Sequence, residues 1–218
     1  MNSKLHLFKV VILCTVLSAC QTTSNKPADL PKKLAVKSEA TLEPDDQLYK
    51  ALEAFAKGDY LQSSADIKAA AKSMRELEEK EKDQHRKQAI EKAAEALDGE
   101  STKIEKKQVN DITTLYPSLG QTGRALAGSR LTSIENEFNR HNEEKAGALL
   151  TKTVIQLEKS VTTHHRVLNS REQQLLTDAM GVAERLKKGD TVDQNELKKV
   201  VRNIDAEIEK WNKEFEIL

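Results

Sequence analysis

The chain has 218 residues, and its 35 basic side chains balance its 35 acidic ones. Hydrophobic residues make up 38% and aromatic residues 4%, with 8 glycines and 4 prolines. Glycine and proline are too few for a protein built of strands and tight turns, and apolar residues are too many for a fully disordered chain. A neutral, aromatic-poor chain is also a poor candidate for nucleic-acid binding. Two cysteines exclude a disulfide framework and a cysteine-rich zinc module.

The first 19 residues are predicted to be a signal peptide. Lys4 and Lys9 supply positive charge, and an apolar run covers residues 10–17. Such a run is too short to cross a bilayer, which needs about 20 apolar residues. A short apolar run behind a basic start is typical of an export signal.

The end of this segment, Leu17-Ser18-Ala19-Cys20, resembles the lipobox of bacterial lipoproteins. The resemblance implies that the chain is cut before Cys20 and that this thiol carries a diacylglycerol. Gln21 follows the cysteine, and in enterobacterial relatives of this signal the absence of Asp there favours the outer membrane. The resemblance therefore predicts attachment to the periplasmic face of the outer membrane. The alternative is an ordinary secretory signal in which Cys20 is incidental.

Residues 20–44 are predicted to form a flexible tether, because they mix prolines with polar residues and show no sustained period. From residue 45 to 218 the apolar residues recur at helical spacing. We therefore expect an all-α fold, an elongated helical bundle with coiled-coil-like hairpins. The expected helices cover about 46–57, 60–97, 102–116, 121–168, 171–188 and 194–217. We expect Gly58 and Gly99 to end the first two helices and Pro117 to end the third. Ser170-Arg171-Glu172-Gln173 is expected to form a capping box for the fifth.

The first expected hairpin lies near residues 48–71. Its sequence LYKALEAFAKGDYLQSSADIKAAA resembles one tetratricopeptide unit, with Gly58-Asp59-Tyr60 at the place of that family's turn. Ala51, Ile67 and Ala70 fall near its packing positions, whereas Ser63 stands where alanine is expected. No second unit follows at the family's spacing, and such solenoids need about three units to share a core. The alternative is a generic helical hairpin that ends at a glycine.

The last expected helix has an unbroken apolar seam, which suits either internal packing or self-association. We expect the seam to fold back onto the segment around 150–168, because Ser170 and Gly189 favour antiparallel turns. A homo-oligomer formed through the seam is the alternative. The seam consists of Leu197, Val201, Ile204, Ile208, Trp211 and Phe215.

The best candidates for a metal site are His141, Glu144 and His164. His141 and Glu144 are spaced to share a helix face, whereas His164 lies on an apolar seam. On one continuous helix the two histidines would be about 35 Å apart, too far for joint ligation. We therefore prefer a hydrogen-bonded core histidine at 164 and treat the spacing of His141 and Glu144 as a chance match in a glutamate-rich chain, because metal sites need several converging groups.

The sequence contains no H-E-x-x-H, G-x-S-x-G, Walker or dinucleotide motif. We therefore expect no catalysis and no cofactor. The predicted function is a lipid-anchored, periplasmic scaffold or interaction protein of the bacterial cell envelope, with an envelope protein as partner. The alternative is a periplasmic stress protein that binds a metal or small ligand. The sequence does not indicate which molecule is bound.

Overall fold

The computed structural model describes residues 43–215, so the predicted signal peptide, Cys20 and most of the predicted tether lie outside the described residues. The described segment is built from helices, which confirms the all-α prediction. In chain order the elements are α1 (Pro44–Ala56), α2 (Tyr60–Glu78), α3 (Gln84–Glu105), the 3₁₀ helix η1 (Ile112–Leu115), α4 (Tyr116–Asn139), α5 (Glu143–Thr162), α6 (Ser170–Lys188) and α7 (Gln194–Phe215).

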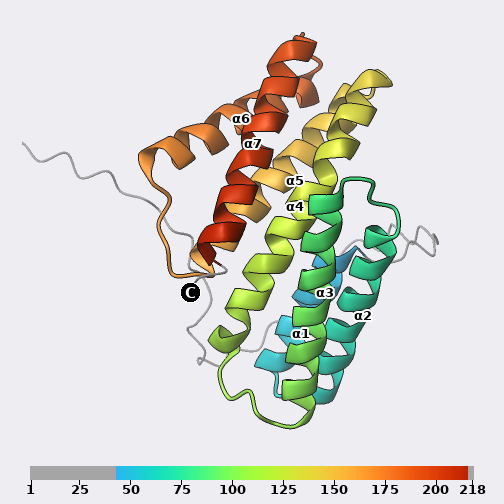
Figure 1. Ribbon diagram of the computed structural model, residues 1–218, viewed down its shortest axis with the longest axis vertical. Helices are drawn as coiled ribbons and strands as arrows, with labels where there is room; N and C mark the ends of the chain where they lie inside the picture. The colour runs from blue at the N-terminus through green and yellow to red at the C-terminus, as the bar shows by residue number, and fades with distance from the viewer. Residues whose placement is uncertain (1–42, 216–218) are drawn as a thin grey trace, which may run out of the picture. The chain divides into compact units, whose positions relative to one another are not determined.

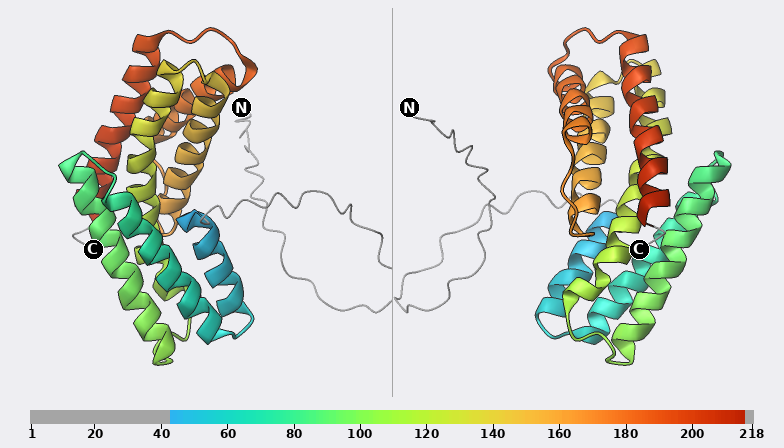
Figure 2. Two further views of the ribbon diagram at one scale, coloured as in Figure 1. Left: turned by 90° about the vertical axis from the view of Figure 1, so that its right-hand side faces the viewer. Right: turned by 60° about the vertical axis from the view of Figure 1, so that its left-hand side comes forward.

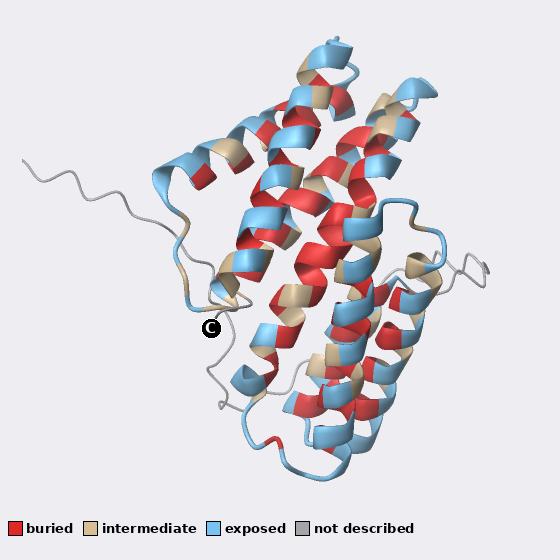
Figure 3. Ribbon diagram, in the orientation of Figure 1, coloured by how far each residue is buried: buried red, intermediate tan, exposed pale blue. Residues whose placement is uncertain are grey.

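Helix α4 is the central element of the described segment. It packs against α3, α5 and α7, and 13 of its 24 residues are buried. Figure 3 shows buried residues along most of its length. Its interior is rich in glycine, alanine and serine, and small side chains allow neighbouring helices to approach closely. At Gly120, for example, an added Cβ would lie 2.5 Å from the Thr163 hydroxyl that follows α5.

Two sets of helices lie on either side of α4 (Figures 1 and 2), and each set has its own hydrophobic core. The N-terminal core joins α1, α2, α3 and η1 to residues 125 and 126 of α4. The C-terminal core joins residues 127, 131 and 134 of α4 to α5, α6 and α7. The side chains of α4 therefore divide between two separate sets of helices.

The expected helix over 60–97 is instead two helices, α2 and α3, which pack side by side. The charged run from residue 78 to 88 favours helix only through ion pairs worth about 0.2–0.5 kcal/mol each. Folding back buries Met74 of α2 and Ile90 of α3 completely, and each such side chain contributes about 1.5–3 kcal/mol. Asp83 caps α3 by accepting a hydrogen bond from the Arg86 amide at 3.0 Å. The chain therefore turns where its apolar face is interrupted.

The prediction of a helix over 102–116 is wrong. Helix α3 continues through Gly99, which was expected to stop it, and ends at Glu105. This extension buries Ile104 in the N-terminal core, which compensates the cost of about 1 kcal/mol for a helical glycine. Pro117 lies in the first turn of α4 instead of ending a helix, a position that suits proline because no intrahelical donor is lost there.

The expected helix over 121–168 is also divided, into α4 and α5. The chain reverses at residues 140–142, where His141 adopts a positive φ of 59°. The reversal places the apolar residues of α4 against those of α5, so that Ile134 and Leu150 share the C-terminal core. The apolar residues expected on one long helix therefore lie on two helices, where they face each other.

Several predicted helix ends are confirmed, and others shift by a residue. Gly58 has the expected left-handed conformation, with φ of 78°, and α1 and α2 pack together as a helical hairpin. The capping box of α6 uses Asn169 and Glu172, one residue before the predicted Ser170. Asp45 and Asp46 lie in the first turn of α1, where Glu43 holds the cap position.

The seam of α7 folds back into the C-terminal core, as expected. Its members from residue 197 to 211 are buried, and Phe215 is half-buried against the same core. The packing partners of α7 are α4 and α6, whereas the prediction placed the seam on the segment around 150–168. Trp211 has no exposed surface. Among the described helices, none is long and apolar enough to cross a bilayer.

Candidate functional site

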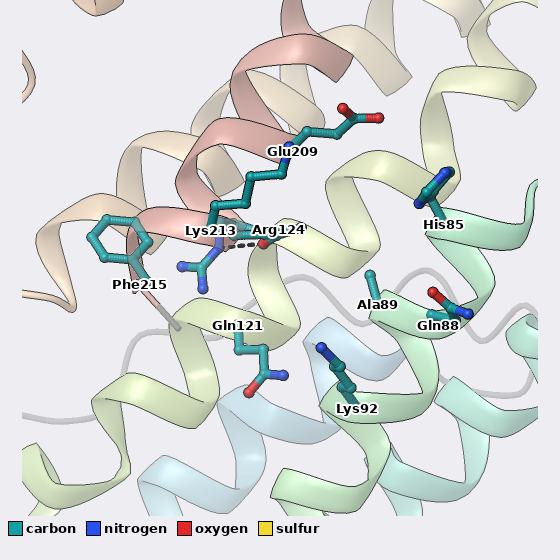
Figure 4. A pocket seen from close by; sticks show the side chains of 10 residues that line it. His85, Gln88, Ala89, Lys92, Gln121, Arg124, Glu209, Lys213 and Phe215 are labelled. Carbon is teal, nitrogen blue, oxygen red and sulfur yellow. Dashed lines mark hydrogen bonds between the residues drawn. The ribbon is translucent and has the colours of Figure 1, made fainter. Parts of the chain in front are cut away.

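A cleft of about 310 Å³ lies over α4, between α3 and α7 (Figure 4). Both flanking helices pack on α4 but make little contact with each other, because they belong to different cores. The volume of the cleft is at the lower end of the range of small-molecule sites, but its lining is mostly polar, whereas such sites are mostly apolar. The lining residues are His85, Gln88, Ala89, Lys92, Gln121, Arg124, Glu209, Asn212, Lys213 and Phe215.

Arg86 links the two sides of this cleft at the N-terminal end of α3. Its Nη2 lies 2.8 Å from Asp205 Oδ2 on α7, and its Nη1 donates to the Thr132 hydroxyl on α4 at 2.7 Å. Burial opposes the charge on Arg86, but the hydrogen bond and charge of Asp205 outweigh it and raise the pKa of Arg86. One side chain therefore joins α3, α4 and α7.

Arg124 forms part of the cleft floor. It is only 3% exposed, and its Nε donates to Asn212 Oδ1 on α7 at 2.8 Å. The guanidinium carbon also lies 4.6 Å from the centre of the Phe215 ring, a distance at which a cation is attracted to an aromatic face. Arg124 is therefore held in a defined position where α4 meets the end of α7.

His164 is hydrogen-bonded to Arg124, and this contact sets the tautomer of its ring. Arg124 Nη1 lies 3.2 Å from His164 Nε2, and because a guanidinium only donates hydrogen bonds, Nε2 must accept. The proton of the neutral ring is then on Nδ1. Burial first, and then the charge of Arg124, lower the pKa of His164. His164 also packs edge-on against Phe215, with ring centres 4.1 Å apart, so it is a packed and hydrogen-bonded ring.

Several charged side chains line the cleft. Among the described residues that line it, Lys92, Arg124 and Lys213 carry positive charge, and Glu209 carries negative charge. His85 and three side-chain amides add further polar groups that can hydrogen-bond. An adjoining hollow of about 50 Å³ adds Arg86, Asp83 and Asp205, so charges of both signs line this part of the surface.

The most buried charge in the described segment is Glu172, at the start of α6, with no exposed side-chain surface. Arg166 binds both carboxylate oxygens, at 3.0 and 2.6 Å. The same carboxylate also accepts hydrogen bonds from the backbone N–H of Asn169 at 2.9 Å, the indole N–H of Trp211 at 3.1 Å and Nζ of Lys210 at 3.1 Å. Burial alone would raise the pKa of Glu172, but the four donors outweigh it and hold the pKa well below its usual range. This carboxylate is fully engaged and serves to fix α7 against α6.

A second groove, of about 370 Å³, lies between α1 and α5 and also has α4 as its floor. Its two sides carry Tyr49 and Ile155, which are 65% and 41% exposed. Lys152 contacts Glu43 at 2.9 Å, which closes the groove at the start of α1. This groove is more apolar in its lining than the cleft between α3 and α7.

The predicted metal candidates do not form one site. His141 is almost fully exposed in the turn before α5 and 3.8 Å from Glu143, so the expected shared helix face with Glu144 is wrong. His164 lies beyond the other end of α5, and Arg124 occupies its Nε2. Within residues 43–215, no three His, Cys, Asp or Glu side chains are placed to hold a metal ion.

Glu172 and Arg124 were not identified from the sequence as buried charged residues that join helices. Glu172 was noticed only as a member of a capping box, and its second role depends on Trp211, 39 residues away. One feature of the sequence could have indicated that Arg124 is buried: it lies among glycine, alanine and serine residues, which favour close helix packing. The lipidation residue Cys20 lies outside the described segment.

Comparisons with known proteins supply no family for this chain. No protein-family model matches it, and no curated protein or solved structure is significantly similar to it.

Proposed function

We propose that this chain is a lipid-anchored interaction protein of the bacterial cell envelope, held on the periplasmic face of the outer membrane, without catalysis of its own. The observation that carries the proposal is the Leu17-Ser18-Ala19-Cys20 motif at the end of a short apolar run. Two or more acyl chains give stable anchoring, because each buried methylene contributes about 0.8 kcal/mol. The anchor in this proposal is lipid, joined to the helical body through residues 20–43.

The described helices support the interaction part of the proposal. Helix α4 is flanked by a polar cleft on the side of α3 and α7 and by a more apolar groove on the side of α1 and α5. Both are open to solvent and have rigid helical walls. Preformed concave surfaces of this kind favour recognition, because little ordering is needed when a partner binds.

The alternative is a stress protein that binds a metal or a small ligand. Of these two, the structure favours only the small ligand. The separation of His141 from His164 gives no support to a metal site. The cleft between α3 and α7 is large enough for a small molecule. A small-ligand role is therefore the second candidate function.

The anchor is tested by mass spectrometry of the protein isolated from its native envelope. We expect an amino-terminal Cys20 that carries acyl chains, and recovery of the protein with membranes. Cys20→Ser should release it to the soluble fraction, whereas Cys14→Ser, inside the segment predicted to be removed, should leave it anchored. An unmodified Cys20 in a chain that retains Met1 would contradict the proposal.

The partner is tested by crosslinking intact cells that express the anchored protein. We expect one envelope protein to be recovered in stoichiometric amount with the wild type. The Cys20→Ser variant should lose this partner or recover much less of it, since it no longer resides at the membrane. Equal recovery of many unrelated proteins would contradict a specific scaffold role.

A further inference from the structure

We propose that the hydrogen bond between Arg124 and His164 is a pH-sensitive switch, in which protonation of His164 releases the last turn of α7 and changes the shape of the cleft between α3 and α7. A switch of this kind goes beyond the proposed function and does not depend on the lipid anchor. Asn212, Lys213 and Phe215 belong to the last turn of α7, and all three line the cleft. Movement of this turn therefore changes one wall of the cleft.

The hydrogen bond can form only while the ring of His164 is neutral. Arg124 Nη1 lies 3.2 Å from His164 Nε2, and a guanidinium has no lone pair with which to accept a hydrogen bond. Protonation places a hydrogen on Nε2, so that two donors face each other where a donor and an acceptor were paired. Arg124 also contacts other groups of the chain, but the loss of the acceptor on His164 is independent of them.

The ring of His164 has little room to turn toward a different partner. An added Cβ on Gly120 of α4 would lie 3.2 Å from His164 Cε1, so the ring rests against the backbone of α4. The same ring packs edge-on against Phe215, with ring centres 4.1 Å apart, and the guanidinium of Arg124 lies 4.6 Å from the centre of the Phe215 ring. A charge on His164 therefore acts directly on the contacts that hold Phe215.

The ionisable groups around His164 act in both directions, and the neutral ring prevails. Burial is the largest effect, and together with the charges of Arg124 and His165 it lowers the pKa of His164. Glu214 of α7 favours the charged ring, but Arg166, in the same loop as His164, already binds Glu214 at 2.8 Å. His164 is only half-buried, so solvent protons can reach it.

The lowered pKa sets the pH range of the switch. The folded protein favours the neutral ring, so the stabilisation is fully present above the value of the unfolded chain, about 6.5, and is lost as the pH falls from there toward the folded value. The buried carboxylate of Glu172, whose pKa lies well below its usual range, holds Trp211 by a hydrogen bond of 3.1 Å. Release near pH 6 is therefore limited to the residues that follow Trp211.

The test is hydrogen exchange, measured by NMR on the full-length protein in detergent micelles at about pH 7.5 and 5.5. The probes are the amides of residues 212–215. The amides of residues 200–204, in the middle of α7, are the internal reference, since pH changes the intrinsic exchange rates of both sets alike. Relative to this reference, we expect residues 212–215 to exchange about three- to tenfold faster at the lower pH, because a proton that prefers the released form by that factor shifts the equilibrium equally.

Matched variants assign the effect to one ring. His164→Gln keeps a side-chain oxygen that can accept from Arg124 but does not titrate in this range, so residues 212–215 should stay protected at both pH values. His165→Gln removes the neighbouring, exposed histidine and should behave as the wild type. The ring nitrogens of His164 are observed in the same samples, and we expect a titration midpoint below that of the same ring in the urea-denatured chain.

Any of three results would overturn the switch: equal relative exchange of the wild type at both pH values, the same pH effect in His164→Gln, or loss of the pH effect in His165→Gln. If His164→Gln loosens the turn at both pH values, the titration of the wild-type ring decides. A midpoint below that of the denatured chain supports the switch, and a midpoint at or above it overturns the switch.

Discussion

The two cores on either side of α4 are stabilised in different ways. The N-terminal core uses small apolar side chains in closely packed helices, such as Ala70, Ala71 and Ala94. Its buried polar contacts are single hydrogen bonds between neighbouring helices, such as Ser64 to Ser101 at 2.9 Å and Ser118 to Glu100 at 3.0 Å. The C-terminal core contains the one tryptophan of the chain, bonded to the fully buried carboxylate of Glu172, which also binds Arg166 and Lys210. The second core thus depends on one fully buried carboxylate that joins several partners, whereas the first has no fully buried charge among its described residues.

The largest effect is expected from Trp211→Ala. Truncating a fully buried tryptophan leaves a cavity, and such changes cost about 3–5 kcal/mol of unfolding free energy. Chemical denaturation of the full-length protein in detergent measures the loss. Trp211→Phe is the matched control, since it keeps most of the volume and removes the indole N–H, and it should cost clearly less. Similar stability in all three proteins would show that the C-terminal core does not depend on Trp211.

Glu172→Gln tests the charge network without changing the shape of the side chain. The substitution removes the negative charge that holds Arg166 and Lys210, and we expect a loss of about 2–3 kcal/mol. Glu184→Gln, which removes an exposed carboxylate from the same helix, should change stability by much less. Equal effects of the two variants would contradict a special role for Glu172.

The same carboxylate predicts how stability depends on pH. The pKa of Glu172 is lower in the folded protein than in the unfolded chain. Its contribution is therefore fully present above the unfolded value, about 4.3, and is lost as the pH falls toward the folded value. Wild type should lose more stability than Glu172→Gln between about pH 5 and 3, as measured by denaturation at each pH. Parallel pH profiles would contradict the network.

Gly147→Ala tests the close packing of α5 on α6 in the C-terminal core. An added Cβ would lie 2.7 Å from the Ala183 carbonyl oxygen and 2.9 Å from Leu186 Cβ, so we expect a loss of about 1–3 kcal/mol. Gly181, on α6, has nothing within 4 Å of an added Cβ. Gly181→Ala should therefore stabilise the protein by about 0.5–1 kcal/mol. Melting temperatures that move in the same direction for both variants would contradict this packing.

The smallest effect is expected from Arg86→Gln, which removes the ion pair between α3 and α7. The pair is partly exposed, so we expect a loss of about 0.5–1 kcal/mol. Hydrogen exchange should speed up near residues 86 and 205 and not in the middle of α6. Arg202→Gln, at an exposed position of α7, is the control. Unchanged exchange at both positions would show that Arg86 does not couple the cores.

The fold class, the last helix and the turns at Gly58 and Gly189 could be predicted from the sequence, because apolar spacing and turn residues report local structure directly. Gly99 was misleading, because burial of Ile104 extends α3 past it. The breaks at residues 79–83 and 140–142 could not, since neither contains glycine or proline. There the gain from burying the faces of two helices outweighs local helix preference, and that gain depends on contacts between distant residues.

The cleft could not be predicted for the same reason. Lys92, Arg124 and Lys213 are dispersed along the sequence, and only the packing of α3 and α7 on α4 brings them together. Arg124 and Glu172 are charged residues at buried positions, and sequence patterning assigns such residues to the surface. In contrast, the Cys20 motif is contiguous, so it could be recognised in the sequence but remains a prediction.

The most direct test of a membrane-anchored interaction protein is site-specific photocrosslinking in living cells. A photoreactive amino acid replaces Lys213 in the cleft or, as a control, Lys199 on the same helix. We predict that position 213 captures one envelope protein, that position 199 does not, and that Cys20→Ser abolishes the capture. Equal capture from both positions, or unchanged capture by the Cys20→Ser variant, would contradict the account.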